Sequence, residues 1–243
     1  MNLLILGANS DVAYATAQQF AANLKADLFL ASRNLELLEK KARDLEIRYG
    51  VKARAMVFDT VDMSTHKAFY QSLDPKPDGV ITAFGYLGDQ TMAQTDFQEA
   101  LKVIGTNFIG AASILEIVAA DFQQRGQGFI IGISSVAGER GRQSNYFYGA
   151  AKGAFSIYLS GLRNRLSKHR VRVITVLPGF IQTKMTHSLD LPALLTALPE
   201  QAAADIFAAY HKSKDVVYTR WFWRWIMVVI KAIPESLFKR LSL

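Results

Sequence analysis

Cysteine is absent from the 243-residue sequence, which excludes disulfide bonds, thiolate catalysis and cysteine-ligated metals. A chain without disulfides is typical of a reducing compartment. Long apolar runs are also missing: the N-terminal run, residues 3–6, is too short for a signal peptide and ends at Gly7. No stretch approaches the roughly 18–20 apolar residues that a membrane span requires. We therefore expect a cytoplasmic protein, either soluble or peripheral at the inner face of the cell membrane.

Histidines are few and scattered. His66, His169, His187 and His211 show no metal-ligand spacing, so we expect no metal site. Acidic residues are also in the minority, 21 against 28 basic ones, and the net charge of +7 suits a phosphate-bearing ligand, an anionic membrane surface or nucleic acid. No nucleic-acid recognition motif accompanies this charge, so we expect no nucleic-acid partner.

The sequence does contain a regular alternation of short apolar runs with longer amphipathic segments. Continuous apolar strands are typical of a parallel sheet covered on both faces, and the amphipathic segments are long enough to be its crossover helices. We therefore predict an α/β protein: a single-domain Rossmann fold, with a doubly wound parallel sheet of about seven strands and helices on both faces. The predicted strands are residues 3–6, 28–31, 53–58, 79–83, 129–134, 171–177 and 216–218, and the predicted helices are residues 12–24, 35–49, 65–73, 97–124 and 149–169.

The C-terminal part departs from this alternation. Residues 1–218 form the predicted Rossmann-type catalytic domain, within which we expect residues 186–213 to be an insertion or lid over the substrate. Residues 219–243 form a tail with three tryptophans and five basic residues against one acidic residue. Tryptophans flanked by cations are typical of a membrane interface, and we predict peripheral membrane contact there. The alternative is a helix that covers the substrate cleft or lies at the interface of a homo-oligomer.

The first predicted strand leads into a turn that suits a dinucleotide phosphate. Small residues there let the backbone N–H groups at a helix N-terminus approach a pyrophosphate. Only Gly7 remains of the usual glycine pattern, because Asp11 and Ala13 stand where glycines are common. Asp11 brings a carboxylate close to an anionic ligand, and we expect it to cap the helix with its side chain turned away. The predicted cofactor-binding residues of this turn are Gly7, Asn9, Ser10, Asp11 and Val12.

The ends of the next strands carry further candidates. Asp27 is the right number of residues after Gly7 to bind a ribose hydroxyl, but it opens the second strand rather than ending it. The end of that strand carries Ser32 and Arg33, and a guanidinium there favours a 2′-phosphate, hence NADPH, with NAD as the alternative. Asp59 can accept a hydrogen bond from adenine, and small residues at Ala83 and Gly85 leave room for a nucleotide across the sheet.

The most specific pattern joins Ser135, at the end of the fifth strand, to Tyr148 and Lys152 at the start of a helix. Tyr148 and Lys152 are four residues apart and share one helical face. A phenol has a pKa of about 10, too high for acid–base work near neutrality, and a nearby ammonium lowers it. Ser135 can hydrogen-bond the same substrate oxygen. This combination predicts a site for acid–base chemistry on a substrate oxygen.

With these motifs, the sequence resembles the short-chain dehydrogenase/reductase family from residue 3 to about residue 183. The resemblance implies a nicotinamide cofactor and a catalytic set of Asn107, Ser135, Tyr148 and Lys152. Asn107 would kink the long helix and carry a proton-relay water. The resemblance also implies further cofactor contacts from the turn after the sixth strand, at Pro178, Gly179, Ile181 and Thr183. It implies that the Pro178–Gly179 turn closes over the nicotinamide, with Thr183 on the carboxamide or pyrophosphate side.

More narrowly, residues 86–90, 138–146 and 218–223 resemble a bacterial subgroup that includes the reductase of a decaprenylphosphoryl 2-keto-pentose. This resemblance implies an NADPH-dependent reductase of a keto sugar carried on a polyprenyl phosphate. The alternatives are a reductase or dehydrogenase of a soluble ketone or acyl substrate, and a non-catalytic dinucleotide-binding sensor. A sensor has no use for the proton donor that Ser135, Tyr148 and Lys152 provide.

Overall fold

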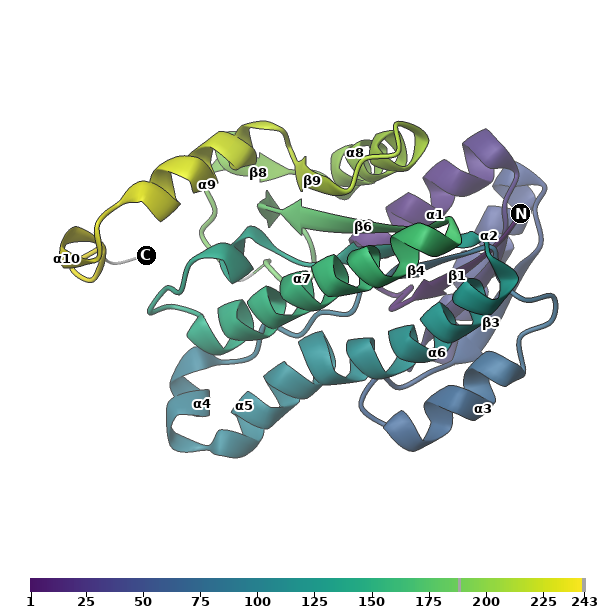
Figure 1. The fold of residues 1–243 in the computed structure, drawn as a ribbon, viewed down its shortest axis with the longest axis horizontal. Helices are drawn as coiled ribbons and strands as arrows, with labels where there is room; N and C mark the ends of the chain where they lie inside the picture. The colour runs from purple at the N-terminus through teal and green to yellow at the C-terminus, as the bar shows by residue number, and fades with distance from the viewer. Residues whose placement is uncertain (188, 242–243) are drawn as a thin grey trace.

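The computed structural model describes residues 1–187 and 189–241; residue 188 of the predicted lid and residues 242–243 of the predicted tail lie outside the described residues. Seven strands form one parallel sheet in the order β3-β2-β1-β4-β5-β6-β9 (Figure 1). The prediction of a doubly wound, single-domain Rossmann fold is confirmed. The strands are β1 Asn2–Leu6, β2 Asp27–Ser32, β3 Ala53–Val57, β4 Gly79–Thr82, β5 Gly128–Ile133, β6 Val171–Pro178 and β9 Val216–Thr219.

Alternate residues of each strand face two separate apolar cores. Leu3 and Ile5 of β1 point to one core, and Leu4 and Leu6 to the other. Successive side chains of a strand point to opposite faces, so the apolar residues of the central strands are buried under one layer of helices or the other. The edge strands are less covered, and Val57 of β3 is 60% exposed. The first core is covered by α1 Asp11–Leu24, α2 Leu35–Tyr49 and α8 Pro199–His211, and the second by α3 His66–Gln71, α6 Gly110–Arg125 and α7 Tyr146–Leu166.

The long helix predicted at residues 97–124 is divided. It consists of α5 Phe97–Ile104, a π-helical turn η2 Gly105–Ile109, and α6, and it follows the short helix α4 Gln90–Thr95, which was not predicted. By length and composition alone, the helical segment Phe97–Arg125 is long and apolar enough to cross a membrane. The expectation that no stretch approaches the length of a membrane span is therefore wrong. Ile114, Leu115 and Val118 are fully buried against the sheet, so this helix belongs to the core of the domain.

The segment predicted to be a lid is only partly irregular. Residues 199–211 form α8, in which Ala202, Ala203 and Ile206 are fully buried in the core beside α1. The small alanine side chains allow α8 to pack close to α1. Residues 199–211 therefore belong to the core of the domain and not to a lid, so the predicted lid of residues 186–213 is too long. Between β6 and α8, a two-stranded pair joins β7 Phe180–Ile181 to β8 Thr196–Ala197. The remaining short helices are η1 Met63–Thr65, η3 Val136–Glu139, η4 Ser167–His169 and η5 Ala193–Leu195.

The C-terminal segment forms α9 Phe222–Ala232 and α10 Glu235–Phe238, which project beyond the carboxyl ends of the strands (Figure 1). The three tryptophans differ in their surroundings. Trp223 is only 2% exposed, whereas Trp221 is 71% and Trp225 is 59% exposed. The inner face of α9 therefore packs on the domain while its outer face meets solvent, so the prediction that all three rings lie at a membrane surface is wrong for Trp223.

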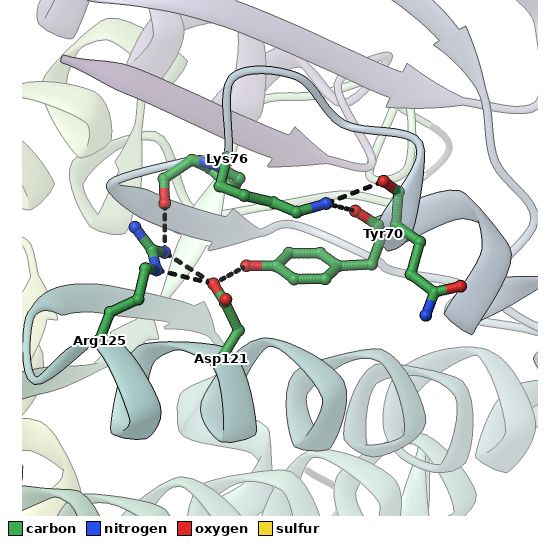
Figure 2. A network of polar contacts seen from close by, with 6 residues as sticks. Tyr70, Lys76, Asp121 and Arg125 are labelled. Carbon is green, nitrogen blue, oxygen red and sulfur yellow. Dashed lines mark hydrogen bonds and ion pairs between the residues drawn. The ribbon is translucent and has the colours of Figure 1, made fainter.

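A polar network holds α3 to α6 near the amino end of β4 (Figure 2). Asp121 accepts hydrogen bonds from the Tyr70 hydroxyl at 2.7 Å and from Nε of Arg125 at 2.9 Å. Arg125 also donates to the carbonyl oxygen of Pro77 at 2.7 Å, and Lys76 donates to that of Tyr70 at 2.9 Å. Burial, and then Asp121, raise the pKa of the Tyr70 phenol. The network thus fixes the loop that leads into β4.

Asp121→Ala should therefore lower the free energy of unfolding by about 2 kcal/mol, the order expected when charge-assisted hydrogen bonds are lost and their donors are left unpaired. Urea denaturation measures this loss. Because the network lies at the amino end of β4, turnover of the folded variant should match that of the wild type. A fully stable variant would show that the network contributes nothing to the fold.

Candidate active site

A cavity of about 360 Å³ opens at the carboxyl ends of the strands, beside the point where strand order reverses between β1 and β4. Ligands of open α/β sheets bind at such a switch point. All but one of the predicted site residues line this cavity: Gly7, Asn9, Ser10, Asp11, Val12, Arg33, Asp59, Ala83, Gly85, Ser135, Tyr148, Lys152, Pro178, Gly179, Ile181 and Thr183. The exception is Asn107.

The turn after β1 has a backbone that only glycine accommodates well. Gly7 has φ of +80°, and a Cβ added there would lie 2.9 Å from the carbonyl carbon and oxygen of Ala83. The chain then enters α1, whose first residues Asp11 and Val12 line the cavity and whose first N–H groups have no partner within the helix. A left-handed glycine, small neighbours and a helix N-terminus are what a dinucleotide pyrophosphate requires. These residues therefore fit a dinucleotide.

Asp11 does not cap α1 as expected. It is the first residue of that helix, with Ser10 at the cap position, and its Oδ2 accepts a hydrogen bond from the backbone N of Lys184 at 3.0 Å. This bond joins the phosphate turn to the loop beyond β7. The carboxylate also attracts the ammonium group of Lys41 electrostatically. Lys41 thus partly offsets the charge of Asp11, which stands where a glycine is common.

Lys41 contacts the carbonyl groups of the same turn. No sequence motif indicated this residue. Its Nζ donates to the carbonyl oxygens of Ala8 at 3.1 Å and Asn9 at 3.2 Å. Burial lowers the pKa of Lys41 to about 8, although the charge of Asp11 opposes this shift. Lys41 therefore fixes the carbonyl side of the turn, leaving its N–H groups for a ligand.

Arg33 and Asp59, the two residues predicted to contact the adenosine part of the cofactor, differ in how many contacts they make within the protein. Arg33, just after β2, is exposed at the rim of the cavity. Asp59 also lines the cavity, but its Oδ1 accepts a hydrogen bond from the backbone N of Val61 at 3.1 Å. Asp59 is thus a turn former whose carboxylate still reaches the cavity wall.

Lys152 is the most constrained side chain of the site. It is 2% exposed, and its Nζ donates to the carbonyl oxygens of Phe84 at 2.9 Å and Ile133 at 3.1 Å. Burial lowers the pKa of Lys152 to about 7. The same Nζ lies 5.9 Å from the ring centre of Tyr148.

Burial raises the pKa of Tyr148 to about 12, and a hydrogen bond with Ser135 partly opposes this. This contradicts the expectation that Lys152 lowers the phenol pKa in the protein alone. The physical reason is the burial of Tyr148 itself, which disfavours the charged phenolate. A lowered phenol pKa thus requires a bound ligand or a fully protonated Lys152.

Close backbone packing brings Ser135 and Tyr148 to one side of the cavity. A Cβ on Gly149 would lie 2.8 Å from the carbonyl oxygen of Ala137, and one on Gly138 would lie 2.5 Å from the backbone N of Gly153. These glycines let α7 rest directly on the loop that follows Ser135. The Ser135 hydroxyl itself accepts a hydrogen bond from the backbone N of Ala137 at 3.1 Å.

Asn107 lies in the π-helical turn and is 1% exposed. Its Nδ2 donates to the carbonyl oxygens of Tyr86 at 2.7 Å and Val103 at 2.8 Å, and its Oδ1 accepts from the backbone N of Tyr86 at 3.3 Å. Both amide hydrogens are thus used within the protein. The side chain holds the loop after β4 to the helix, and the relay water at Asn107 stays a prediction.

Several cavity residues were not predicted. Thr60, Thr106 and Met185 line it, and a Cβ on Gly85 would lie 2.7 Å from Cε of Met185. The loop after Thr183 therefore crosses the cavity and reaches the end of β4. Thr60 and Met185 lie in segments with no periodic pattern, and Thr106 lies within a predicted helix where no motif singles it out. Within residues 1–187 and 189–241, no three histidine, aspartate or glutamate side chains are grouped as metal ligands.

Known proteins share both the sequence pattern and the fold. The short chain dehydrogenase family model matches residues 1–192. The chain belongs to the short-chain dehydrogenase/reductase family. An uncharacterized oxidoreductase of Mycobacterium tuberculosis is 33% identical over 242 residues, covering 98% of this chain and 96% of the relative.

Solved short-chain dehydrogenases have the same fold at lower identity. One from Sphingobium yanoikuyae, in complex with NADPH, has a TM-score of 0.79 and 22% identity, covering 97% of each chain. One from Burkholderia cenocepacia, in complex with NADP, has a TM-score of 0.82 and 21% identity, covering 100% of this chain and 97% of the other. The protein is thus an oxidoreductase of this family, whose cofactor is a nicotinamide dinucleotide.

The buried lysine of this short-chain dehydrogenase predicts a pH dependence of stability. The pKa of Lys152 is about 7 in the folded protein and 10.5 in the unfolded chain. Between these values the unfolded chain binds the extra proton, so the stability contribution of this group rises with pH and is lost as pH falls through 7. Relative to Lys152→Met, the wild type should gain roughly 1 kcal/mol per pH unit from pH 7.5 to 9.5.

Urea denaturation at several pH values measures this difference. Lys67→Met, at an exposed position of α3, is the control and should run parallel to the wild type. Parallel curves for the wild type and Lys152→Met would contradict the assignment of a neutral, buried lysine.

Proposed function

We propose that the protein is an NADPH-dependent reductase that converts a ketone to an alcohol. The observation that carries this proposal is that Ser135, Tyr148 and Lys152 line the same cavity as the phosphate turn of Gly7. The rival hypothesis, a dinucleotide sensor without activity, leaves the buried lysine beside a phenol and a serine unexplained. Burying such a charge is costly, and perturbed groups of this kind cluster at functional sites.

A bound nicotinamide dinucleotide supplies the hydride for such a reduction. Ser135 orients the carbonyl oxygen of the substrate, and Tyr148 donates a proton to that oxygen as it becomes an alkoxide. The raised pKa of Tyr148 keeps the phenol protonated at neutral pH, and an alkoxide is a stronger base than a phenolate, so the transfer is downhill. Lys152, protonated, stabilises the phenolate that remains and also binds ribose hydroxyls. Asn107 acts by holding the loop after β4 in place.

For the cofactor we propose NADP rather than NAD. Arg33 is exposed at the end of β2 and free to pair with a 2′-phosphate, for which a guanidinium is well suited. The charge of Lys41 attracts the carboxylate of Asp11, which reduces the repulsion between Asp11 and the phosphates. The complexes of two fold relatives with NADPH or NADP agree with this preference.

For the substrate we propose an apolar or lipid-linked ketone, such as a keto sugar on a polyprenyl phosphate, taken up at the inner membrane surface. The outer face of α9 supports this, since Trp221, Trp225, Val228 and Val229 are 71%, 59%, 49% and 65% exposed. The basic residues Arg224, Lys239 and Arg240 of the same C-terminal segment are also exposed. Interfacial tryptophans beside cations bind anionic bilayers reversibly. A soluble ketone or acyl substrate is the alternative, and α9 would then serve a homo-oligomer contact.

The chemistry is tested by Tyr148→Phe. Loss of the proton donor should lower turnover by roughly 10²–10⁴-fold, the range typical of general acid catalysis. NADPH binding, followed by fluorescence, should persist. Near wild-type turnover in this variant, with the fold intact by circular dichroism, would refute Tyr148 as the acid.

The cofactor preference is tested by Arg33→Ala. Loss of a charge-assisted contact to the 2′-phosphate should weaken NADPH by about tenfold or more, while NADH changes little. Dissociation constants for both cofactors measure this. Equal losses, or a wild type that prefers NADH, would show that Arg33 does not read the phosphate.

Membrane contact is tested by vesicle co-sedimentation of the wild type and of Trp221→Ser/Trp225→Ser across a salt series. Truncation near residue 218 would not serve, because it also removes the buried Trp223. The wild type should sediment with anionic vesicles at low salt and be released as salt screens its cations. The double variant should remain in solution. A monodisperse wild type that never sediments would exclude the membrane proposal.

A further inference from the structure

We propose that Trp223 of α9 is a positioning residue for the nicotinamide end of the cofactor site, acting through the turn at Pro178 and Gly179; this inference rests on the proposed function. The C-terminal tail then helps to shape the active site. The tail was predicted either to contact a membrane or to pack on the protein. The inner face of α9 packs on the domain, and its outer face is exposed.

The indole ring of Trp223 lies directly on the backbone of Gly179. A Cβ added to Gly179 would lie 1.9 Å from Cε2 and 2.0 Å from Nε1 of the indole, so only glycine allows this contact. Gly179 has no side chain with which to fix its own conformation. The ring, 2% exposed, therefore limits the positions that this turn can take.

The same ring also holds the segment on the far side of the turn. Its Nε1 donates a hydrogen bond to the carbonyl oxygen of Leu195 at 3.3 Å, and it packs edge-on against Phe180 with ring centres 5.0 Å apart. Leu195 lies in η5, just before the strand that pairs with β7. One side chain thus connects the turn after β6 to the segment that follows it.

α9 is itself fixed to the loop that follows Ser135. The carboxylate of Glu139 accepts hydrogen bonds from Nζ of Lys231 at 2.5 Å and from the Tyr218 hydroxyl at 2.9 Å. Arg140 donates to the carbonyl oxygen of Lys231 at 3.0 Å and to Glu235 at 2.8 Å. Contacts at both ends therefore set Trp223 relative to the serine loop.

An apolar cluster completes this link. Trp223 and Met227 are buried together with Val136, which follows Ser135, and with Leu177, which precedes Pro178. The two segments that carry Ser135 and the Pro178–Gly179 turn both line the cavity. Through α9 these two segments pack as one unit. Such packing matters for catalysis because misplacement of a reacting group by about 1 Å can lower the rate by about 10²-fold.

The test compares NADPH with 2′-phospho-ADP-ribose, which has the same adenosine and phosphates but lacks the nicotinamide. In full-length Trp223→Leu, calorimetry should show NADPH weakened by about tenfold, because the turn no longer holds its place. Affinity for the nicotinamide-free ligand should stay within about twofold of the wild type. A general loss of stability cannot produce this difference.

The matched control is Phe122→Leu. Phe122 is also a fully buried aromatic residue, but its ring packs on Gly128 at the amino end of β5, away from the cavity. The control should bind both ligands as the wild type does. This control shows how a comparable loss of core packing, at a position remote from the cavity, affects the affinity for the two ligands.

A double-mutant cycle with Gly179→Ala provides the second measurement. In the wild-type background the added Cβ collides with the indole, so Gly179→Ala should weaken NADPH by about tenfold or more. In the Trp223→Leu background the added methyl group has room, and the further loss should be smaller. If Trp223→Leu fails to fold, a normal NADPH affinity of Gly179→Ala alone overturns the proposal.

Equal weakening of both ligands in Trp223→Leu, or no weakening of either, would overturn the positioning role. The ligand comparison is independent of turnover. A wild type that binds both ligands but reduces no ketone would refute the proposed function, and the two affinities would still decide the role of Trp223.

Discussion

The Nζ atom of Lys152 donates to the carbonyl oxygens of Phe84 and Ile133, which lie at the carboxyl ends of two adjacent strands, β4 and β5. This arrangement fixes α7 against the sheet and with it Tyr148, one helical turn earlier on the same face. Because the ammonium group is buried, its pKa falls to about 7, so its charge changes near neutral pH. The position of the phenol and its electrostatic surroundings therefore both follow from how one lysine is held.

Contacts that only glycine permits also hold together the segments around the cavity. Gly7 lies against the backbone of Ala83, Gly149 against Ala137, and Gly179 under the indole of Trp223. Each lets one segment approach its neighbour closely because the glycine has no side chain. Protein interiors are packed densely enough that such contacts transmit small displacements. The C-terminal helix is part of this arrangement, and only its outer face remains available to a membrane or another subunit.

The strands and most of the crossover helices could be predicted because their apolar runs are continuous and their spacing is regular. Ser135, Tyr148 and Lys152 could be placed together because the ends of parallel strands meet at one edge of a sheet. The bond from Asp11 to Lys184 and the contact of Trp223 with Gly179 join residues far apart in sequence, with no local pattern to indicate either. The raised pKa of Tyr148 could not be predicted because it follows from burial, which depends on the whole fold.

The central claim is that hydride reaches a ketone carbon in this cavity, and isotope transfer tests it most directly. The full-length protein would be incubated with NADPH deuterated at C4 of the nicotinamide, on each face in turn, and an apolar ketone. The account predicts that one of the two labelled cofactors places deuterium on the carbinol carbon of the alcohol, as seen by mass spectrometry. Oxidation of NADPH without labelled alcohol, or an alcohol free of deuterium with both cofactors, would contradict it.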